Sequence, residues 1–192
     1  MLSRSRKVYD HTSNESIITP KSYGKSIKPS DLPDGMRRFF PLSPVTTFKP
    51  EGQGLPKDLL LPILHGVLKD VRSIRTALAN TELRMVGGSL LIVYEADWEV
   101  ARTALDAQTS KAASRADTTN SAGVEAAKEN EDEMGYDSDA ESAEDEAPAY
   151  AVRLIDFAHT RLVPGEGPDE GVLKGIDTTI NLLEGRIQEL SV

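Results

Sequence analysis

The stretch VRLIDFAHTRLVPGEGPDEG, residues 152–171, leads from the most strand-like part of the chain into its last helix. The aliphatic residues of YAVRLIDF stop at a single carboxylate, Asp156. We therefore predict a strand that ends where Asp156 enters a loop. The glycine- and proline-rich PGEGPDEG predicts a tight turn. Asp169 within this turn is expected to cap the final helix, because its side chain can accept hydrogen bonds from the free N–H groups of the first turn.

Two segments repeat apolar residues at the period of an α-helix. Large aliphatic residues recur every three or four positions between Pro56 and Asn80, and the same spacing runs from Val172 to Leu190. Both segments predict long amphipathic helices, each with one face in the core. Pro62 is expected in the first turn of the earlier helix, where its missing N–H breaks no hydrogen bond.

Further strands and a short helix are expected in the rest of the chain. ELRMVGGSLLIVYEAD, residues 82–97, is typical of one or two strands. Because apolar residues occupy both alternating sets of positions, we expect both faces of this segment to be buried. KVYD, residues 7–10, predicts a shorter strand. A helix should follow it, capped by Ser30 and ending near Phe39 and Phe40.

One long segment lacks any core pattern. Residues 99–148 are dominated by Ala, Ser, Thr, Asp and Glu. Such a composition cannot offset the entropy of ordering, so we predict disorder from 103 to 148. Ten acidic residues and no Lys or Arg lie at 129–146, so the net charge of -9 for the chain leaves +1 for the rest. The simpler interpretation of this acidic insert is a solvated spacer, and the alternative is a contact for regulatory protein partners.

These patterns define the fold class and the domains. The expected fold is α+β, with antiparallel strands packed by two long amphipathic helices. The chain divides into 1–102, the insert 103–148, and 149–192.

Composition excludes several classes of function. There are no cysteines, which excludes disulfides and thiolate metal sites, and the three histidines show no zinc-ligand spacing. The longest apolar runs are far shorter than the ~20 residues of a membrane span. The basic residues near the N-terminus lack the aromatic neighbours typical of specific nucleic-acid recognition. We expect a nuclear or cytoplasmic protein.

Asp156 and His159 are the residues most suggestive of chemistry. A carboxylate at a strand end suits Mg²⁺, which prefers hard oxygen ligands and bridges nucleotide phosphates, although a plain turn former is the simpler interpretation. His159 could donate to a substrate phosphate or orient Asp156, or it could be a loop histidine bonded to backbone. The N–H groups of PGEGPDEG could face an anion. Because the carboxylates of Glu166 and Asp169 would repel an anion, a tight link into the final helix is the favoured interpretation.

Four stretches carry a family resemblance. They are KVYD…YGKSIKPSDLPDGMRRFF, the helix around LLLPILHGVLKDVRSIRTAL, RMVGGSLLIVYEAD, and VRLIDFAHT…PGEGPDEGVLKGIDTTINLLEGRI. The last contains Ile-Asp-Phe-Ala-His-Thr and Gly-Pro-Asp-x-Gly. In this order they resemble the inositol polyphosphate kinase family, and within it the fungal inositol polyphosphate multikinases, which also carry an acidic insert. The resemblance covers essentially all segments expected to be ordered, but only the C-terminal portion, or lobe, of the family's kinase domain.

The resemblance implies ATP as co-substrate, Mg²⁺ as cofactor and inositol phosphates as acceptors. Asp156 matches the aspartate that binds Mg²⁺ bridging the ATP phosphates, so it is the expected metal and nucleotide contact. His159 matches the histidine beside the inositol phosphate. Ser89 matches one serine of the strand motif, with a structural role as the alternative. Lys25 stands where the family has arginine, as a candidate substrate contact. No catalytic residue is assigned.

The chain also departs from the family pattern. The Pro-x-x-x-Asp-x-Lys-x-Gly motif, which supplies inositol-binding and catalytic groups, does not occur in it. We expect those groups to come from a missing N-terminal lobe. Two interpretations follow. The chain is the C-terminal part of a kinase that transfers the γ-phosphoryl group of ATP to inositol phosphate hydroxyls. Alternatively it is a truncated, inactive member or an incomplete gene model, acting at most as a binding or scaffold protein.

Overall fold

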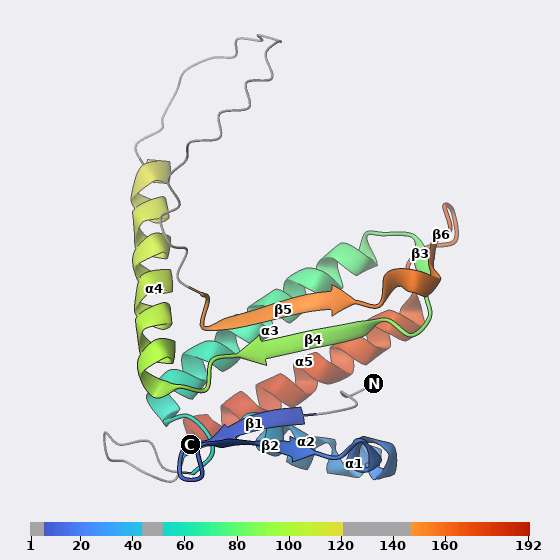
Figure 1. Cartoon of the computed structure of the whole chain (residues 1–192). Coiled ribbons are helices and arrows are strands. Elements are labelled where there is room, and N and C mark those ends of the chain that lie inside the picture. The colour runs from blue at the N-terminus through green and yellow to red at the C-terminus, as the bar shows by residue number, and fades with distance from the viewer. Residues whose placement is uncertain (1–5, 44–51, 121–146) are drawn as a thin grey trace, which may run out of the picture.

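The computed structural model of the chain describes residues 6–43, 52–120 and 147–192. These residues form an α+β fold, as predicted, with small antiparallel sheets packed against long helices. Figure 1 shows β4 and β5 lying across α3 and α5, with α4 at one side and the N-terminal elements below. In chain order the elements are β1 (Arg6–Asp10), β2 (Glu15–Thr19), α1 (Lys21–Ser26), η1 (Pro29–Asp31), α2 (Leu32–Phe39), α3 (Lys57–Ala79), β3 (Leu83–Met85), β4 (Ser89–Tyr94), α4 (Trp98–Asn120), β5 (Tyr150–Ile155), η2 (Phe157–His159), β6 (Thr160–Leu162) and α5 (Glu170–Ser191).

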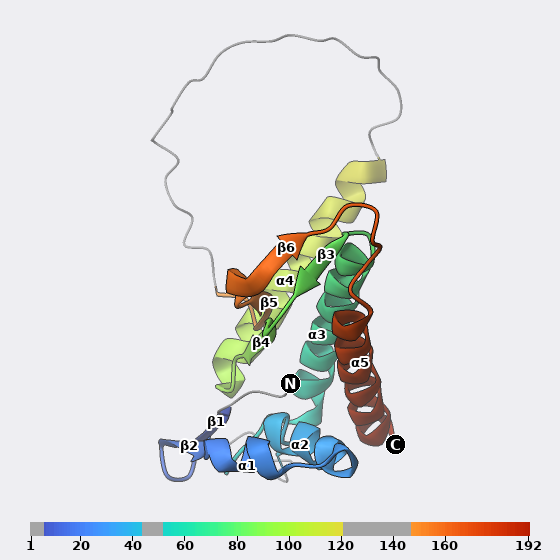
Figure 2. The same cartoon turned by 90° about the vertical axis from the view of Figure 1, so that its right-hand side faces the viewer.

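The centre of the fold is the pair of long helices α3 and α5, which confirms both predicted amphipathic helices. They run antiparallel, side by side (Figure 2), and ion pairs Arg72–Glu184 and Arg75–Asp177 join them at the surface. Exposed ion pairs contribute little, whereas burying one large aliphatic side chain contributes about 1.5–3 kcal/mol. The apolar stripes therefore hold the two helices together. The core includes the fully buried Leu60, Ile63, Leu64, Val67, Val71 and Leu183.

β4 and β5 form a two-stranded antiparallel sheet in which Ser89 lies opposite Ile155. One face of this sheet packs on α3 and the core. On the other face Leu91 is 45% exposed and Val93 is 53% exposed. The prediction that both faces are buried is therefore wrong, because no described element lies over this second face (Figure 1). We call it the outer face of the β4–β5 sheet; its residues are Ser89, Leu91, Val93, Ala151, Arg153 and Ile155.

The N-terminal elements attach to the core through the end of α2. Phe40 is fully buried, and its carbonyl accepts a hydrogen bond from Arg186 Nη2 at 2.9 Å. Arg186 is only 7% exposed and also pairs with Glu189 at 3.0 Å. Its burial is tolerated because the guanidinium is both paired and hydrogen-bonded. The Tyr94 hydroxyl donates to the Phe39 carbonyl at 2.8 Å, which joins α2 to the β4–β5 sheet.

The predicted short strand and short helix near the N-terminus are present as β1 and α2, but two expected helix starts are wrong. Ser30 lies in η1, where its hydroxyl donates to Asp31 Oδ1 at 3.0 Å instead of capping α2. Pro62 lies inside α3, beyond the first turn, because the helix begins at Lys57. At this position the missing N–H leaves the carbonyl of Asp58 without its helical hydrogen bond.

Helix α4 corrects the predicted boundary of the insert. Disorder was expected from residue 103, but α4 continues to Asn120, so this prediction is wrong for 103–120. Ala101 and Ala104, near the start of α4, are buried, and α4 contacts α3. The acidic residues at 129–146 lie outside the described residues.

Gly66 in α3 lets the Tyr150 ring of β5 lie directly on the helix, and a Cβ at this position would come within 2.2 Å of the ring. We predict that Gly66→Ala lowers the free energy of unfolding by about 1–3 kcal/mol through overpacking, even though alanine favours a helix by about 1 kcal/mol. Gly175→Ala in α5 is the control, because a Cβ added there would have no neighbour within 4 Å. That change should stabilise the protein. Urea unfolding measures both, and equal stability of the two variants would contradict the close contact.

Candidate metal and substrate site

The predicted strand end is present, and Asp156 follows it in an unusual backbone conformation. β5 stops at Ile155, and Asp156 has φ 68° and ψ 52°, in the left-handed region. A residue other than glycine costs about 1–3 kcal/mol there, a strain that glycine would avoid. Asp156 is exposed, and no Lys or Arg of the described residues forms an ion pair with it. Its carboxylate is therefore open to a ligand.

Ser89 lies next to Asp156. It begins β4 opposite Ile155, the last residue of β5, so the start of one strand meets the end of the other. Ser89 is half-buried and belongs to the outer face of the β4–β5 sheet. The register of the two strands thus brings the predicted serine and the predicted aspartate together.

His159 reaches the same place through the pairing of β3 with β6. Its carbonyl accepts a hydrogen bond from Val86 N at 3.2 Å, and Met85 lies opposite Thr160. The turn before β4 and the turn after β5 therefore lie side by side. His159 is exposed, as Asp156 is. Three of the predicted site residues, Ser89, Asp156 and His159, gather at one end of the sheets.

Lys25 is not part of this group. It is an exposed residue of α1, among the N-terminal elements that lie below the sheets in Figure 1. No contact within the described residues links it to Asp156, Ser89 or His159. A substrate contact by Lys25 stays a prediction.

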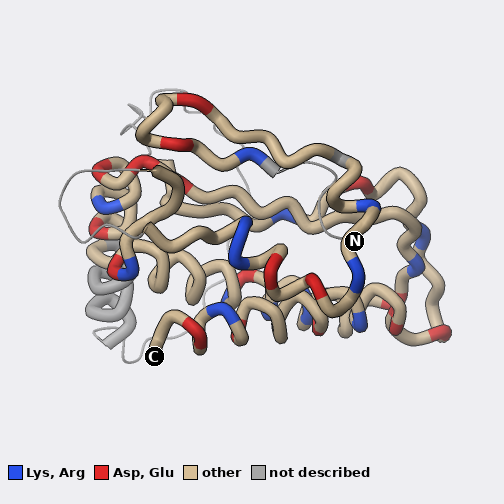
Figure 3. The backbone as a smooth tube through the Cα atoms, turned by 90° about the horizontal axis from the view of Figure 1, so that it is seen from below, with Lys and Arg blue, Asp and Glu red and all other residues tan. Residues whose placement is uncertain are grey.

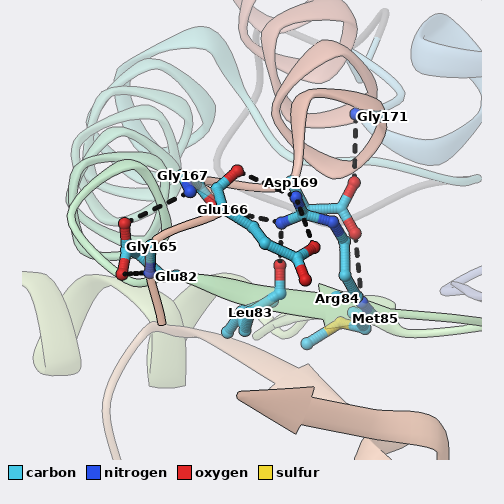
Figure 4. A network of polar contacts seen from close by, with 9 residues as sticks. All are labelled: Glu82, Leu83, Arg84, Met85, Gly165, Glu166, Gly167, Asp169 and Gly171. Carbon is cyan, nitrogen blue, oxygen red and sulfur yellow. Dashed lines mark hydrogen bonds and ion pairs between the residues drawn. The ribbon is translucent and has the colours of Figure 1, made fainter. Parts of the chain in front are cut away.

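The PGEGPDEG turn uses its polar backbone groups within the protein (Figure 4). The N–H groups of Gly165 and Gly167 donate to the Glu82 carboxylate at 2.7 and 3.2 Å. The Arg84 guanidinium donates to the carbonyls of Gly167 and Glu166 at 2.9 and 3.0 Å. These N–H groups are satisfied by a protein carboxylate, which agrees with the tight link favoured over an anion site.

Asp169 is the N-cap of α5, as predicted. Its Oδ1 accepts from the N–H groups of Gly171 and Val172 at 3.1 and 3.2 Å, and its Oδ2 accepts from Met85 N at 3.0 Å. The hydrogen bond from Met85 is the main reason that the pKa of Asp169 is lowered. The bonds from Val172 and Gly171 and the charge of Arg84 lower this pKa further, while burial partly opposes them.

Glu82 and Arg84 were not among the predicted site residues. They flank Leu83 in an alternating segment, and such charges usually indicate a solvated strand face. Their partners at 165–167 are more than eighty residues away in the sequence. Only the pairing of β3 with β6 brings these segments together, so no local pattern could have shown the network.

The residues at the site fit a metal that is shared with a substrate. Among the described residues, no group of three or more His, Asp or Glu side chains could hold a metal by itself. Mg²⁺ usually keeps several waters and is bound through one or two carboxylates plus substrate phosphates, so a single carboxylate at Asp156 fits such an ion. An open pocket of about 610 Å³ along α3, lined by residues such as His65, Lys69 and Arg72, contains none of the predicted site residues.

Charges of both signs are interspersed over the described chain (Figure 3). Two N-terminal basic residues are paired, Arg37 with Glu189 and Arg38 with Asp34. Within the part of the chain that the structure describes, no helix is long and apolar enough to span a membrane.

The sequence profile of the family described as "IPK: Inositol polyphosphate kinase" matches residues 4–184. The chain belongs to the inositol polyphosphate kinase family. This confirms the resemblance seen in the four quoted stretches, and the family is one of ATP-binding kinases that act on inositol phosphates. A comparison with curated proteins found no match.

The structure of this family member is similar to the crystal structure of the inositol phosphate multikinase Ipk2 from S. cerevisiae in complex with ADP and Mn²⁺. The TM-score is 0.54 at 20% sequence identity, and the match covers 94% of this chain and 55% of the Ipk2 chain. At this identity the likeness shows the fold. Because the chain spans only 55% of that protein, the activity and ligands of the whole kinase are proposals for this chain.

The lowered pKa of Asp169 predicts a pH dependence of stability. The fold favours the ionised form, so its contribution is present above the ordinary pKa of 3.8 and is lost as pH falls through the lower folded value. Asp169→Asn keeps a capping oxygen but removes the charge. We expect this variant to melt below the wild type at neutral pH, with a difference that shrinks below pH 3.8. Asp106→Asn, at an exposed position of α4, is the control for thermal unfolding, and a pH-independent difference for Asp169→Asn would contradict the assignment.

The backbone of Asp156 predicts an order of stabilities. Asp156→Gly should be at least as stable as the wild type, whereas Asp156→Ala should lose about 1 kcal/mol, because alanine is strained in the left-handed region. Asn14, with φ 58° in the turn between β1 and β2, provides a control in which glycine should again be more stable than alanine, because both variants lose the same hydrogen bond from the Tyr9 hydroxyl. Urea unfolding measures both series. An alanine variant at 156 as stable as the glycine variant would show that the left-handed conformation is not kept in solution.

Proposed function

We propose that this chain forms the metal- and acceptor-binding part of an enzyme that transfers the γ-phosphoryl group of ATP to a hydroxyl of an inositol phosphate. The observation that carries the proposal is the carboxylate of Asp156, exposed and without an ion-pair partner among the described residues, beside Ser89 and His159. Membership of the inositol polyphosphate kinase family supports the same class of reaction.

In this proposal Asp156 holds Mg²⁺ together with the phosphates of ATP. The ion, when bound, neutralises charge that redistributes over the phosphate oxygens during transfer. The chain's contribution is to keep the carboxylate at a defined point beyond β5. The backbone of Asp156 lies in the left-handed region, and the hydrogen bond from Val86 N to the His159 carbonyl joins the loop after it to the turn before β4. Such fixed positioning is a large part of catalysis of phosphoryl transfer.

His159 is the proposed contact for the inositol phosphate. Its exposed imidazole can donate a hydrogen bond to a phosphate or a hydroxyl, and the bond from Val86 N to its carbonyl fixes the backbone that carries it. The Ser89 hydroxyl, on the next strand, is proposed as a weaker contact on the same side. Lys25 would add a further substrate contact only if the substrate extends toward α1.

The outer face of the β4–β5 sheet offers an apolar surface for the nucleotide base. Leu91 and Val93 are exposed on it, two and four residues beyond Ser89. A strand rises by about 3.3 Å per residue, so this surface begins about 7 Å from the serine. A nucleotide with its phosphates near Asp156 would place its base there and cover apolar area that is now in water.

A second candidate function is binding without turnover. Two observations favour it: the described residues supply one carboxylate at the site, and the sequence lacks the Pro-x-x-x-Asp-x-Lys-x-Gly motif. In that case Asp156 and His159 would bind Mg·nucleotide and inositol phosphate without transfer, and the chain would act as a binding or scaffold protein.

The experiment uses the full chain with Mg²⁺, ATP or ADP, and an inositol trisphosphate. We expect Mg·ADP to bind, measured by calorimetry, and Asp156→Asn to weaken this binding more than about tenfold because a metal ligand is lost. Asp106→Asn is the matched control and should bind as the wild type does. Formation of a more highly phosphorylated inositol, dependent on Asp156, supports the kinase. Binding without turnover supports the second candidate, and the absence of both contradicts the two proposals together.

A further inference from the structure

Arg153 is the one charged residue on the outer face of the β4–β5 sheet. It lies in the middle of β5, opposite Leu91, and is exposed. The other residues of this face, defined above, are uncharged. A strand in an apolar face gains little from an arginine, because the guanidinium favours water and its long side chain loses entropy when held in place. The question is which partner this exposed cation has.

The described residues provide few partners for the Arg153 guanidinium. Arg153 Nη1 donates to the carbonyl of its own neighbour, Val152, at 3.0 Å. No Asp or Glu among the described residues forms an ion pair with it. By contrast, Arg84 reaches three carbonyls and the Glu166 carboxylate, and Arg75 forms two bonds to Asp177. A guanidinium has five N–H donors, so Arg153 keeps most of its donors for a ligand.

Arg153 is also placed to act together with Asp156. The two residues are three positions apart, which corresponds to about 10 Å along a strand. The outer face carries Arg153 and Ile155 and ends beside Asp156. A ligand that binds the carboxylate and extends over this face would therefore reach Arg153. The carboxylate suits a metal ion, and the guanidinium suits an anion bridged by that ion.

We propose that Arg153 binds a phosphate group of one of the two substrates that meet at Asp156. This inference rests on the proposed function and adds a residue to it. The planar fork of arginine matches two oxygens of one phosphate, which a lysine cannot do. The phosphate belongs either to the nucleotide or to the inositol phosphate, and the two sources are separated by experiment.

The test measures the dissociation constants of Mg·ADP and of an inositol trisphosphate separately, by calorimetry on the full chain. Arg153→Met should weaken the binding of one of these ligands by roughly tenfold to a hundredfold, the effect of losing a charge-assisted pair of hydrogen bonds. Arg153→Lys should recover part of this loss, because it keeps the charge but not the fork. Arg102→Met is the matched control, since Arg102 is exposed on α4 and pairs with Asp58, away from the outer face.

Each result decides the assignment. A loss confined to Mg·ADP assigns the phosphate to the nucleotide, and a loss confined to the inositol phosphate assigns it to the acceptor. If Asp156→Asn loses Mg·ADP while both Arg153 variants bind both ligands as the wild type does, the inference about Arg153 is wrong and the proposed function stands. If the wild type binds neither ligand, both are wrong. Thermal unfolding of each variant shows whether the fold is kept, and Arg153→Lys decides the question if Arg153→Met unfolds.

Discussion

The antiparallel register of β4 against β5 is the constraint on which the candidate site depends. With Ser89 opposite Ile155, the end of one strand meets the start of the other, and Asp156 emerges beside Ser89. A slip of one residue would exchange the two faces of a strand, so that Arg153 would turn toward the core and Leu154 toward water. In the shifted arrangement the guanidinium would be buried without a partner. This costs more free energy than the backbone hydrogen bonds between the shifted strands would return. The core therefore fixes the register, and the register places the site.

The helices under the sheet hold that register in turn. The Tyr150 ring of β5 lies directly against Gly66 of α3, where a larger residue would leave it no room. α3 is held by α5, and the start of α5 is fixed by Asp169, which also accepts a bond from Met85 at the end of β3. The carboxylate of Asp169 thus joins α5 to β3, the strand that leads into the turn before β4.

Local patterns predicted the parts of this arrangement that depend on neighbours in sequence. The N-cap at Asp169 and the strand end at Asp156 were predicted because each is a property of a few adjacent residues. The exposure of Leu91 and Val93 was missed, because an apolar run cannot show which face the rest of the fold covers. The extent of α4 was missed for another reason: its alanines give a strong helix propensity without the apolar stripe that was sought.

The same distinction between local sequence and tertiary structure applies to the candidate site. Asp156 and His159 were singled out by their position after the predicted strand, and the family resemblance gave them their roles and added Ser89. The sheet pairings bring the three together. Lys25 came from the same resemblance but lies on a separate element. The absence of charge partners around Arg153 among the described residues depends on tertiary structure, and a sequence pattern contains no information on it.

Two sets of charges near the candidate site differ in their partners, and the difference bears on function. Glu82, Arg84 and Asp169 are surrounded by hydrogen-bond partners and stabilise the turn before α5. Asp156 and Arg153 have no ion-pair partner within the described residues, and Arg153 donates only to the carbonyl of its neighbour Val152. The backbone of Asp156 is also strained. A strained carboxylate adds no stability to a fold, and an exposed cation without an ion-pair partner adds little. A cation beside the carboxylate and an anion beside the arginine would satisfy both at once, and a metal-bridged phosphate supplies that pair in one ligand.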